Sequence, residues 1–171
     1  MYGNVYWITG LAGAGKTTVG RMLYERLKDE KPNVVFLDGD ELREIFGNDL
    51  GHTLKDRQIS AMRNSRLCCA LAEQGIDVVC ATISMFHEVR RWNRAHIPGY
   101  IEIYLQVSME VLTARDKKKL YSSVSNGVGG NVIGVDLEVE EPESPDIVIQ
   151  NDGKLLPEDV VDIICAMKKT Y

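Results

Sequence analysis

The chain has 171 residues, 20 of them basic and 25 acidic, so its net charge is −5, and 44% of the residues are hydrophobic. This length suits one domain with a buried core, and an acidic chain lacks the basic footprint of a nucleic-acid binder. Because the sequence has no apolar run near the ~18–20 residues of a membrane span and no secretory signal pattern, we expect a cytoplasmic protein that binds neither membranes nor nucleic acid.

Apolar runs with strand character alternate with helical patterns along the chain. We expect strands at about 5–8, 34–37, 78–83, 101–107 and 147–149. Helical periodicity starts at about 17 and recurs at about 57–73, 88–95, 109–116 and from 157, whereas 41–56 is a polar segment. The expected apolar faces of three helices are Val19, Met22, Leu23 and Leu27; Met62, Leu67, Ala70 and Leu71; and Val160, Val161, Ile164 and Met167. Apolar strands separated by helices are typical of an α/β fold, a mostly parallel sheet covered on both faces.

Residues 10–17 match the phosphate-binding P-loop pattern, Gly-x-x-x-x-Gly-Lys-Thr. The segment joins an expected strand to an expected helix, so backbone N–H groups and the helix N-terminus would converge on phosphate oxygens. Lys16 would reach the β- and γ-phosphates, and the Thr17 hydroxyl would bind Mg²⁺. A Gly-rich turn before an ordinary helix is the alternative, but it leaves Lys16 and Thr17 unexplained. The pattern therefore predicts one P-loop NTPase-type, three-layer α/β/α kinase domain over residues 1–171.

Two carboxylates, Asp38 and Asp40, follow the second expected strand, at the sheet edge where ligands bind in such folds. Opposite a phosphate cradle, they suit Mg²⁺ binding and the activation of an attacking hydroxyl. We therefore expect Lys16, Asp38 and Asp40 to be catalytic, with Thr17 and Asp38 as metal ligands. A solvated Asp-Gly turn is the alternative. Arg43 lies one helical turn after Asp40 and could meet an anionic substrate.

Residues 122–136 are rich in Gly, Ser and Asn, and we expect them to form a mobile lid. The cationic patch before them, Arg115 with residues 117–119, suits a lid that closes on phosphates, as in small-molecule kinases. The patch is too small and isolated on an acidic chain to indicate nucleic-acid binding.

Several short motifs spread over most of the chain occur together. They are the P-loop, Leu37-Asp38-Gly39-Asp40 with Arg43, Asp56-Arg57, Ile83-Ser84, Arg115-Asp116 with Lys118 and Leu120-Tyr121, Gly134-Val135-Asp136, and Glu-Pro-Glu-x-Pro at 141–145. Their combination resembles the adenylylsulfate (APS) kinase family. The resemblance implies a homodimeric kinase that uses ATP and Mg²⁺ to phosphorylate the ribose 3′-hydroxyl of a nucleotide carrying a 5′-phosphosulfate. It implies that ATP contacts Gly13, Ala14, Gly15, Lys16, Thr17, Thr18 and Arg115, and that the acceptor contacts Asp40, Arg43, His52, Arg57, Ser60, Ser84, Lys118, Asn131 and Val132.

The departures from that family fall in the pocket for the acceptor's base. The family has phenylalanines where this chain has His52 and Val132, and an asparagine where it has Ser60. In the family the two rings clamp adenine, and each lost stack would cost roughly 1–3 kcal/mol, so another base is expected here. APS kinase-like enzymes of capsule pathways phosphorylate cytidine diphosphoramidate, and we favour this acceptor slightly over APS.

Two other function classes stay open. A P-loop kinase for gluconate or shikimate would share the P-loop and the Asp-x-Asp edge, but it would not account for the Asp56-Arg57 pair and the later motifs. A nucleotide-sensing switch protein would need no acceptor, and the chain lacks the Asn-Lys-x-Asp motif of GTPases. ATP turnover with and without an acceptor separates a kinase from a switch.

Overall fold

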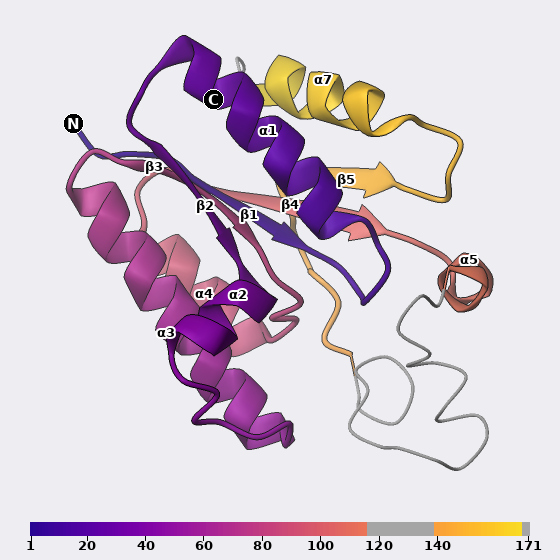
Figure 1. Ribbon diagram of the computed structural model, residues 1–171, viewed down its shortest axis with the longest axis horizontal. Coiled ribbons are helices and arrows are strands. Elements are labelled where there is room, and N and C mark those ends of the chain that lie inside the picture. The colour runs from indigo at the N-terminus through magenta and orange to yellow at the C-terminus, as the bar shows by residue number, and fades with distance from the viewer. Residues whose placement is uncertain (116–138, 169–171) are drawn as a thin grey trace.

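A central parallel sheet organises the protein. In the computed structural model, which describes residues 1–115 and 139–168, the sheet has five strands in the order β2-β3-β1-β4-β5. They are β1 (Val5–Thr9), β2 (Val34–Asp38), β3 (Asp77–Ala81), β4 (Tyr100–Gln106) and β5 (Ile147–Gln150). Since every pair of neighbouring strands is parallel, their carboxyl ends meet at one edge of the sheet (Figure 1), where ligands bind in such folds.

Helices cover both faces of the sheet. They are α1 (Lys16–Glu30), α2 (Gly39–Ile45), α3 (Leu54–Glu73), α4 (His87–His96), α5 (Met109–Ala114) and α7 (Pro157–Lys168). Helices α1 and α7 lie on one face and α3 and α4 on the other, while α2 and α5 follow the carboxyl ends of β2 and β4 (Figure 1). This arrangement confirms the predicted α/β class with three layers around a parallel sheet.

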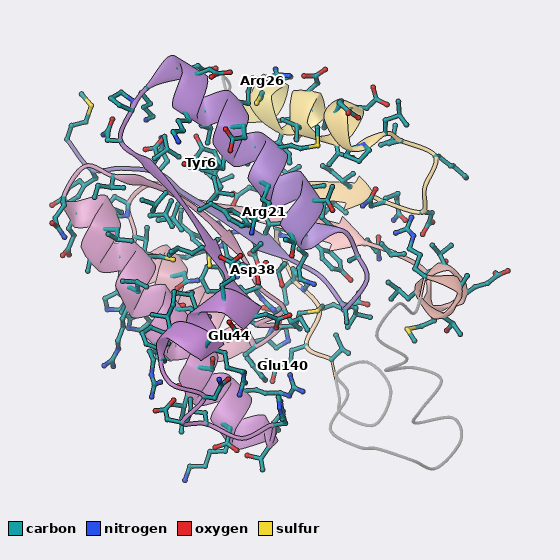
Figure 2. The ribbon with its side chains drawn as sticks, in the orientation of Figure 1. Tyr6, Arg21, Arg26, Asp38, Glu44 and Glu140 are labelled. Carbon is teal, nitrogen blue, oxygen red and sulfur yellow. The ribbon has the colours of Figure 1, made fainter. Side chains whose placement is uncertain are left out.

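The core has two halves because successive side chains of a strand point to opposite faces. In β1, Tyr6 and Ile8 pack in the half beneath α1 and α7, as Figure 2 shows for Tyr6. Val5 and Trp7 pack in the half beneath α3 and α4. All residues of β1 and β3 are buried, so these two strands form a rigid base for the loops that follow them.

The segment expected to be polar after β2 contains α2. Asp38 caps this helix, because its carboxylate accepts a hydrogen bond from the backbone N–H of Asp40 at 2.9 Å. Leu42 is the buried residue of α2. One buried side chain in a helix this short gives no apolar periodicity, so the sequence pattern does not predict it.

Helix α3 begins at Leu54, earlier than the expected start at Arg57. The cause is a capping box in which the side chains of Thr53 and Asp56 each accept a hydrogen bond from the other's backbone N–H. The expected apolar face of α3 is confirmed only in part: Met62 and Leu71 pack against the core, but the most buried side chains of the helix are small or polar ones turned toward the sheet and the ligand cavity. Its buried residues are Ala61, Asn64, Ser65, Cys68 and Ala72, whereas Met62, Leu67 and Leu71 are half-buried and Ala70 is exposed.

Two smaller differences concern β3 and α7. Strand β3 ends at Ala81 instead of residue 83, because its pairing with Ile8 of β1 and Asp38 of β2 ends there. In α7, Val160 and Ile164 are buried as expected, but Met167 in the last turn is 39% exposed.

Candidate active site

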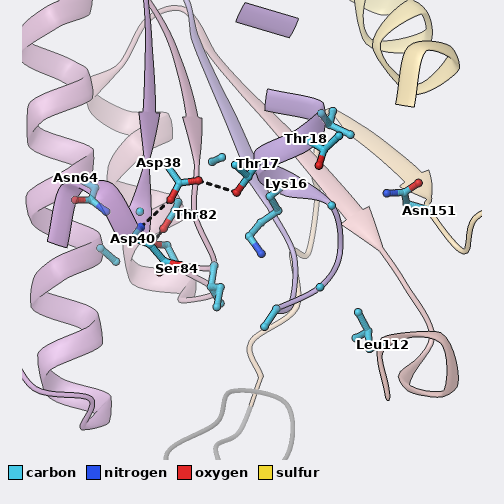
Figure 3. A pocket seen from close by; sticks show the side chains of 18 of the residues that line it. Lys16, Thr17, Thr18, Asp38, Asp40, Asn64, Thr82, Ser84, Leu112 and Asn151 are labelled. Atoms are coloured by element: carbon cyan, nitrogen blue, oxygen red, sulfur yellow. Dashed lines mark hydrogen bonds between the residues drawn. The ribbon is translucent and has the colours of Figure 1, made fainter. Parts of the chain in front are cut away.

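A cavity of about 690 Å³ lies at the carboxyl edge of the sheet (Figure 3). Its walls are the P-loop with the start of α1, the β2–α2 junction, one face of α3 and the loop between β3 and α4. The end of β5 and the start of α7 close it beside the P-loop. The cavity brings together most of the predicted site residues: Gly13, Gly15, Lys16, Thr17, Thr18, Asp38, Asp40, Arg43, Arg57, Ser60, Ser84 and Arg115. Its size is in the range of small-molecule sites, roughly 300–1,000 Å³.

The P-loop backbone forms an anion cradle. Gly13 and Gly15 adopt φ of 81° and 92°, in the left-handed region that glycine enters without steric cost. Gly15 is the N-cap of α1 and has no side chain to cap it, so the first N–H groups of α1 can bind phosphate oxygens. Ala14 is buried beneath the loop, and its N–H donates to the Leu11 carbonyl at 3.1 Å. Ala14 therefore supports the cradle and does not line it.

Two side chains hold the P-loop in shape. Lys16 Nζ donates to the Leu11 carbonyl oxygen at 2.8 Å, and Asn151 Nδ2 donates to the Ala14 carbonyl oxygen at 2.8 Å. A Cβ atom at Gly15 would lie 2.8 Å from Asn151 Nδ2. Position 15 therefore favours glycine for its backbone conformation, and a Cβ atom there would also displace the Asn151 side chain.

Asp38 connects the two sides of the cavity. The Thr17 hydroxyl donates to its carboxylate at 2.7 Å, and the backbone N–H of Asp40 donates to it at 2.9 Å (Figure 3). Asp38 is 8% exposed, whereas Asp40 is exposed and lines the cavity. The adjacent hydroxyl and carboxylate of Thr17 and Asp38 supply the oxygen ligands that Mg²⁺ prefers, so the pair fits the predicted metal site.

Two arginines bring positive charge to the side of the cavity formed by α2 and α3. Arg43 Nη1 donates to the carbonyl oxygens of Leu50 and Gly51 at 2.7 and 3.0 Å. Arg57 Nε donates to the carbonyl oxygen of His52 at 3.1 Å. Both arginines thus line the cavity while they hold the loop between α2 and α3. The His52 side chain is exposed and lies outside the cavity lining, so its contribution in the described structure is the backbone carbonyl.

The loop between β3 and α4 is strained at Ser84. A φ of 31° is uncommon for a non-glycine residue, and such conformations cost on the order of 1–3 kcal/mol. The Ser84 and Thr82 hydroxyls share a hydrogen bond of 2.7 Å, and the Thr9 hydroxyl donates to the Ile83 carbonyl. These contacts hold the strained backbone, a feature that concentrates at ligand sites. Nothing in the sequence marks a serine for positive φ.

Arg115 lies beside the P-loop, with Nη1 at 3.5 Å from the Gly13 carbonyl oxygen. Lys118, Asn131 and Val132 lie outside the described residues. The lid expected at 122–136 lies outside them as well.

Sequence reasoning missed four polar or aromatic residues of the cavity: Asn64, Thr82, Phe86 and Asn151. Helical spacing could have found Asn64, because Arg57, Ser60 and Asn64 recur every three or four residues on one face of α3. Within residues 1–115 and 139–168, no group of three His, Cys, Asp or Glu side chains could hold a metal ion. In the same part of the chain, no helix is long and apolar enough to cross a membrane.

The chain is similar over most of its length to two kinds of kinase. The family model for adenylylsulphate kinase matches residues 2–150. The cytidine diphosphoramidate kinase of Campylobacter jejuni is 44% identical over 163 residues, which cover 94% of this chain and 93% of that protein. The adenylyl-sulfate kinase of Halothermothrix orenii is 36% identical over 162 residues, which cover 95% of this chain and 88% of that protein.

The fold of this chain is also similar to that of a solved APS kinase. The structure of the Mycobacterium tuberculosis APS kinase in complex with AMPPNP and APS matches this one with a TM-score of 0.87 and 29% identity, over 98% of each chain. Together these likenesses decide between the open function classes, in favour of an ATP-dependent kinase that phosphorylates a nucleotide hydroxyl.

Proposed function

Because the chain belongs to the adenylylsulfate kinase family, we propose that it transfers the γ-phosphoryl of ATP to the ribose 3′-hydroxyl of cytidine diphosphoramidate. The observation that carries this choice of acceptor is the 44% identity to a cytidine diphosphoramidate kinase, against 36% to an adenylyl-sulfate kinase. His52 and Val132, in place of the two phenylalanines that clamp adenine in the family, support the same choice. With this acceptor, the enzyme would act in the modification of a bacterial capsule.

The P-loop side of the cavity would hold ATP. Gly13, Gly15 and the start of α1 would supply N–H donors, and Lys16 and Arg115 would meet phosphate charge. Thr17 and Asp38 would hold Mg²⁺, which when bound neutralises charge on the β- and γ-phosphates. The 2.7 Å hydrogen bond between Thr17 and Asp38 supports this pairing.

The opposite side of the cavity would hold the acceptor. Asp40, exposed beside the buried Asp38, would take the proton of the 3′-hydroxyl as its oxygen bonds to the γ-phosphorus and the bond to the β–γ bridging oxygen breaks. Arg43 and Arg57 would face the anionic 5′ group. We retain Ser60, Ser84 and Lys118 as further acceptor contacts, together with Asn131, His52 and Val132.

The second candidate is an adenylyl-sulfate kinase, which the match to residues 2–150 and the APS-bound structural relative favour. The test is kcat/KM for cytidine diphosphoramidate and for APS with Mg·ATP, with ADP release in the absence of acceptor as the control. We expect the cytidine compound to be preferred. A preference for APS would replace the proposed acceptor by the second candidate, and ADP release independent of any acceptor would contradict a kinase.

The base pocket can be tested in the same assay. His52→Phe combined with Val132→Phe should move the ratio of kcat/KM toward APS by about 10–100-fold, which corresponds to roughly 1–3 kcal/mol. An unchanged ratio would mean that these positions do not select the base.

Family membership also leads us to propose a cytoplasmic homodimer of single-domain subunits. Sedimentation equilibrium at several protein concentrations would check the dimer, and a monomer at all of them would contradict it.

A further inference from the structure

The side chain of Asn151 joins the end of the sheet to the P-loop. Asn151 follows β5 directly, and its Nδ2 atom donates to the Ala14 carbonyl oxygen at 2.8 Å. The residue is half-buried and lines the cavity (Figure 3). Its backbone N–H donates to the Gln106 carbonyl oxygen at 2.8 Å. This bond to the end of β4 fixes the point from which the Asn151 side chain reaches the P-loop.

The contact fixes the orientation of one peptide group in the phosphate cradle. The C=O of that group belongs to Ala14 and its N–H belongs to Gly15. In a trans peptide the C=O and the N–H point in opposite directions. Since the carbonyl oxygen is held by Asn151, the N–H of Gly15 points to the opposite side. This N–H donates to no backbone carbonyl among residues 1–115 and 139–168, and Gly15 lines the cavity, so the N–H is available to an anion.

A hydrogen bond to the carbonyl also strengthens the N–H on the same peptide group, because hydrogen bonds in a chain polarise one another. An N–H that binds a charged oxygen contributes more than one that binds a neutral group. Within the part of the chain that the structure describes, Asn151 supplies the one hydrogen bond to the Ala14 carbonyl oxygen. Asn151 therefore both orients and polarises the Gly15 N–H.

We propose that Asn151 is a positioning residue for ATP, an inference that rests on the proposed function. It acts through the Ala14 carbonyl and points the Gly15 N–H at a phosphate oxygen of the nucleotide. The contact lies on the P-loop side of the cavity, whereas Arg43 and Arg57, which would face the acceptor, lie on α2 and α3. Loss of the Asn151 donor therefore weakens the binding of ATP and leaves the binding of the acceptor unaffected.

The experiment measures KM for ATP and KM for the acceptor in Asn151→Ala and Asn151→Asp. The acceptor is whichever of cytidine diphosphoramidate and APS the wild-type protein phosphorylates, so the test does not depend on the choice between them. The alanine removes the donor. The aspartate keeps the shape of the side chain, but its carboxylate cannot donate and adds negative charge beside the nucleotide. The matched control is Gln150→Ala, which removes a side-chain amide, hydrogen-bonded to Gln106, from the preceding residue outside the cavity lining.

Asn151→Ala should raise KM for ATP by about tenfold, and Asn151→Asp should raise it further, while KM for the acceptor stays within about twofold of the wild-type value. Gln150→Ala should leave both KM values within about twofold. An equal rise in both KM values in folded Asn151→Ala, or no rise for ATP, would overturn the proposal. A smaller effect of the aspartate than of the alanine would do the same.

A spectroscopic measurement separates this role from a general loss of stability. In the wild-type protein, saturating ATP should move the amide proton resonance of Gly15 downfield, because the N–H then binds an anionic oxygen. The shift should be smaller in Asn151→Ala at saturating ATP, and an equal shift in the two proteins overturns the proposal even if the variant is less stable. Failure of the proposed function looks different: the wild-type protein would bind no ATP and phosphorylate neither acceptor, and the role of Asn151 would fall with it.

Discussion

Gly15→Ala should weaken both the folded protein and its affinity for ATP. Gly15 has a φ of 92°, where an alanine costs about 1–2 kcal/mol. The new Cβ atom would also lie 2.8 Å from Asn151 Nδ2, which donates to the Ala14 carbonyl. Asn151 would have to move and give up a hydrogen bond worth about 0.5–1.5 kcal/mol. Together the two effects predict a loss of about 1.5–3.5 kcal/mol in the free energy of unfolding.

Gly47→Ala is the matched control, because Gly47 has a φ of 78° and a Cβ atom there would meet nothing within 4 Å. It should lose the backbone contribution alone. The expected difference between the two variants, about 0.5–1.5 kcal/mol, corresponds to about 1–6 °C in Tm for a protein of this size. In an Asn151→Ala background the obstacle and the hydrogen bond are already gone, so the two glycine substitutions should cost the same.

Urea unfolding of the single and double variants measures the stabilities, and calorimetry measures the dissociation constant of ATP. Equal losses for Gly15→Ala and Gly47→Ala in the wild-type background would refute the argument from Asn151. A normal ATP affinity in folded Gly15→Ala would refute the phosphate cradle itself.

Four further predictions address the chemistry, the lid and the effect of pH. Lys16→Ala should lower kcat by on the order of 10³-fold or more without unfolding the protein, because the ammonium stabilises the transferring phosphoryl group; wild-type turnover by the folded variant would contradict a P-loop kinase. Asp38→Asn and Asp40→Asn should each lower kcat by on the order of 10²-fold, and full activity of both at saturating Mg²⁺ would move the acceptor and metal site elsewhere. Amide hydrogen exchange in residues 122–136 should be fast in the free protein and slow with both substrates bound; slow exchange in both states would exclude a lid. Burial raises the pKa of Tyr104 from 10.0 to about 12, so above pH 10 the unfolded chain loses this proton first and stability falls as pH rises; Tyr104→Phe should make the urea midpoint less dependent on pH in that window, and an unchanged slope would contradict the shift.

Elements with a local signal could be predicted from the sequence. The β1 strand, the P-loop and α1 form a continuous segment whose apolar spacing and glycines are visible in a window of about twenty residues. The sequence places Asp38 and Asp40 in the site because they lie at the carboxyl end of an expected strand, and parallel strands bring their carboxyl ends to one edge of the sheet. The structure accordingly gathers the P-loop, both carboxylates, Arg43 and Arg57 around one cavity.

Features that depend on distant residues could not be predicted in this way. Asn151 donates to the carbonyl of Ala14, 137 residues earlier in the chain, and no local sequence pattern connects them. Helix α2 depends on a cap by Asp38 and on one buried leucine. Apolar spacing mispredicts part of the buried face of α3, because it takes no account of the cavity beside the helix: polar Asn64 is buried there, whereas Ala70 is exposed.

The double hydrogen bond of Asp38 has a consequence for how such an enzyme can change in evolution. One carboxylate contacts Thr17 at the start of α1 and the N–H of Asp40 at the start of α2. A substitution of Asp38 would therefore disturb both the side of the cavity proposed to hold ATP and the side proposed to hold the acceptor nucleotide. Positions such as His52 and Ser60 lie in the α2–α3 loop and on α3, on other elements than this junction, and these are positions where we expect the chain to depart from its family. Under the proposed function, a lineage can therefore exchange one acceptor nucleotide for another in small steps while the residues that transfer the phosphoryl group stay unchanged.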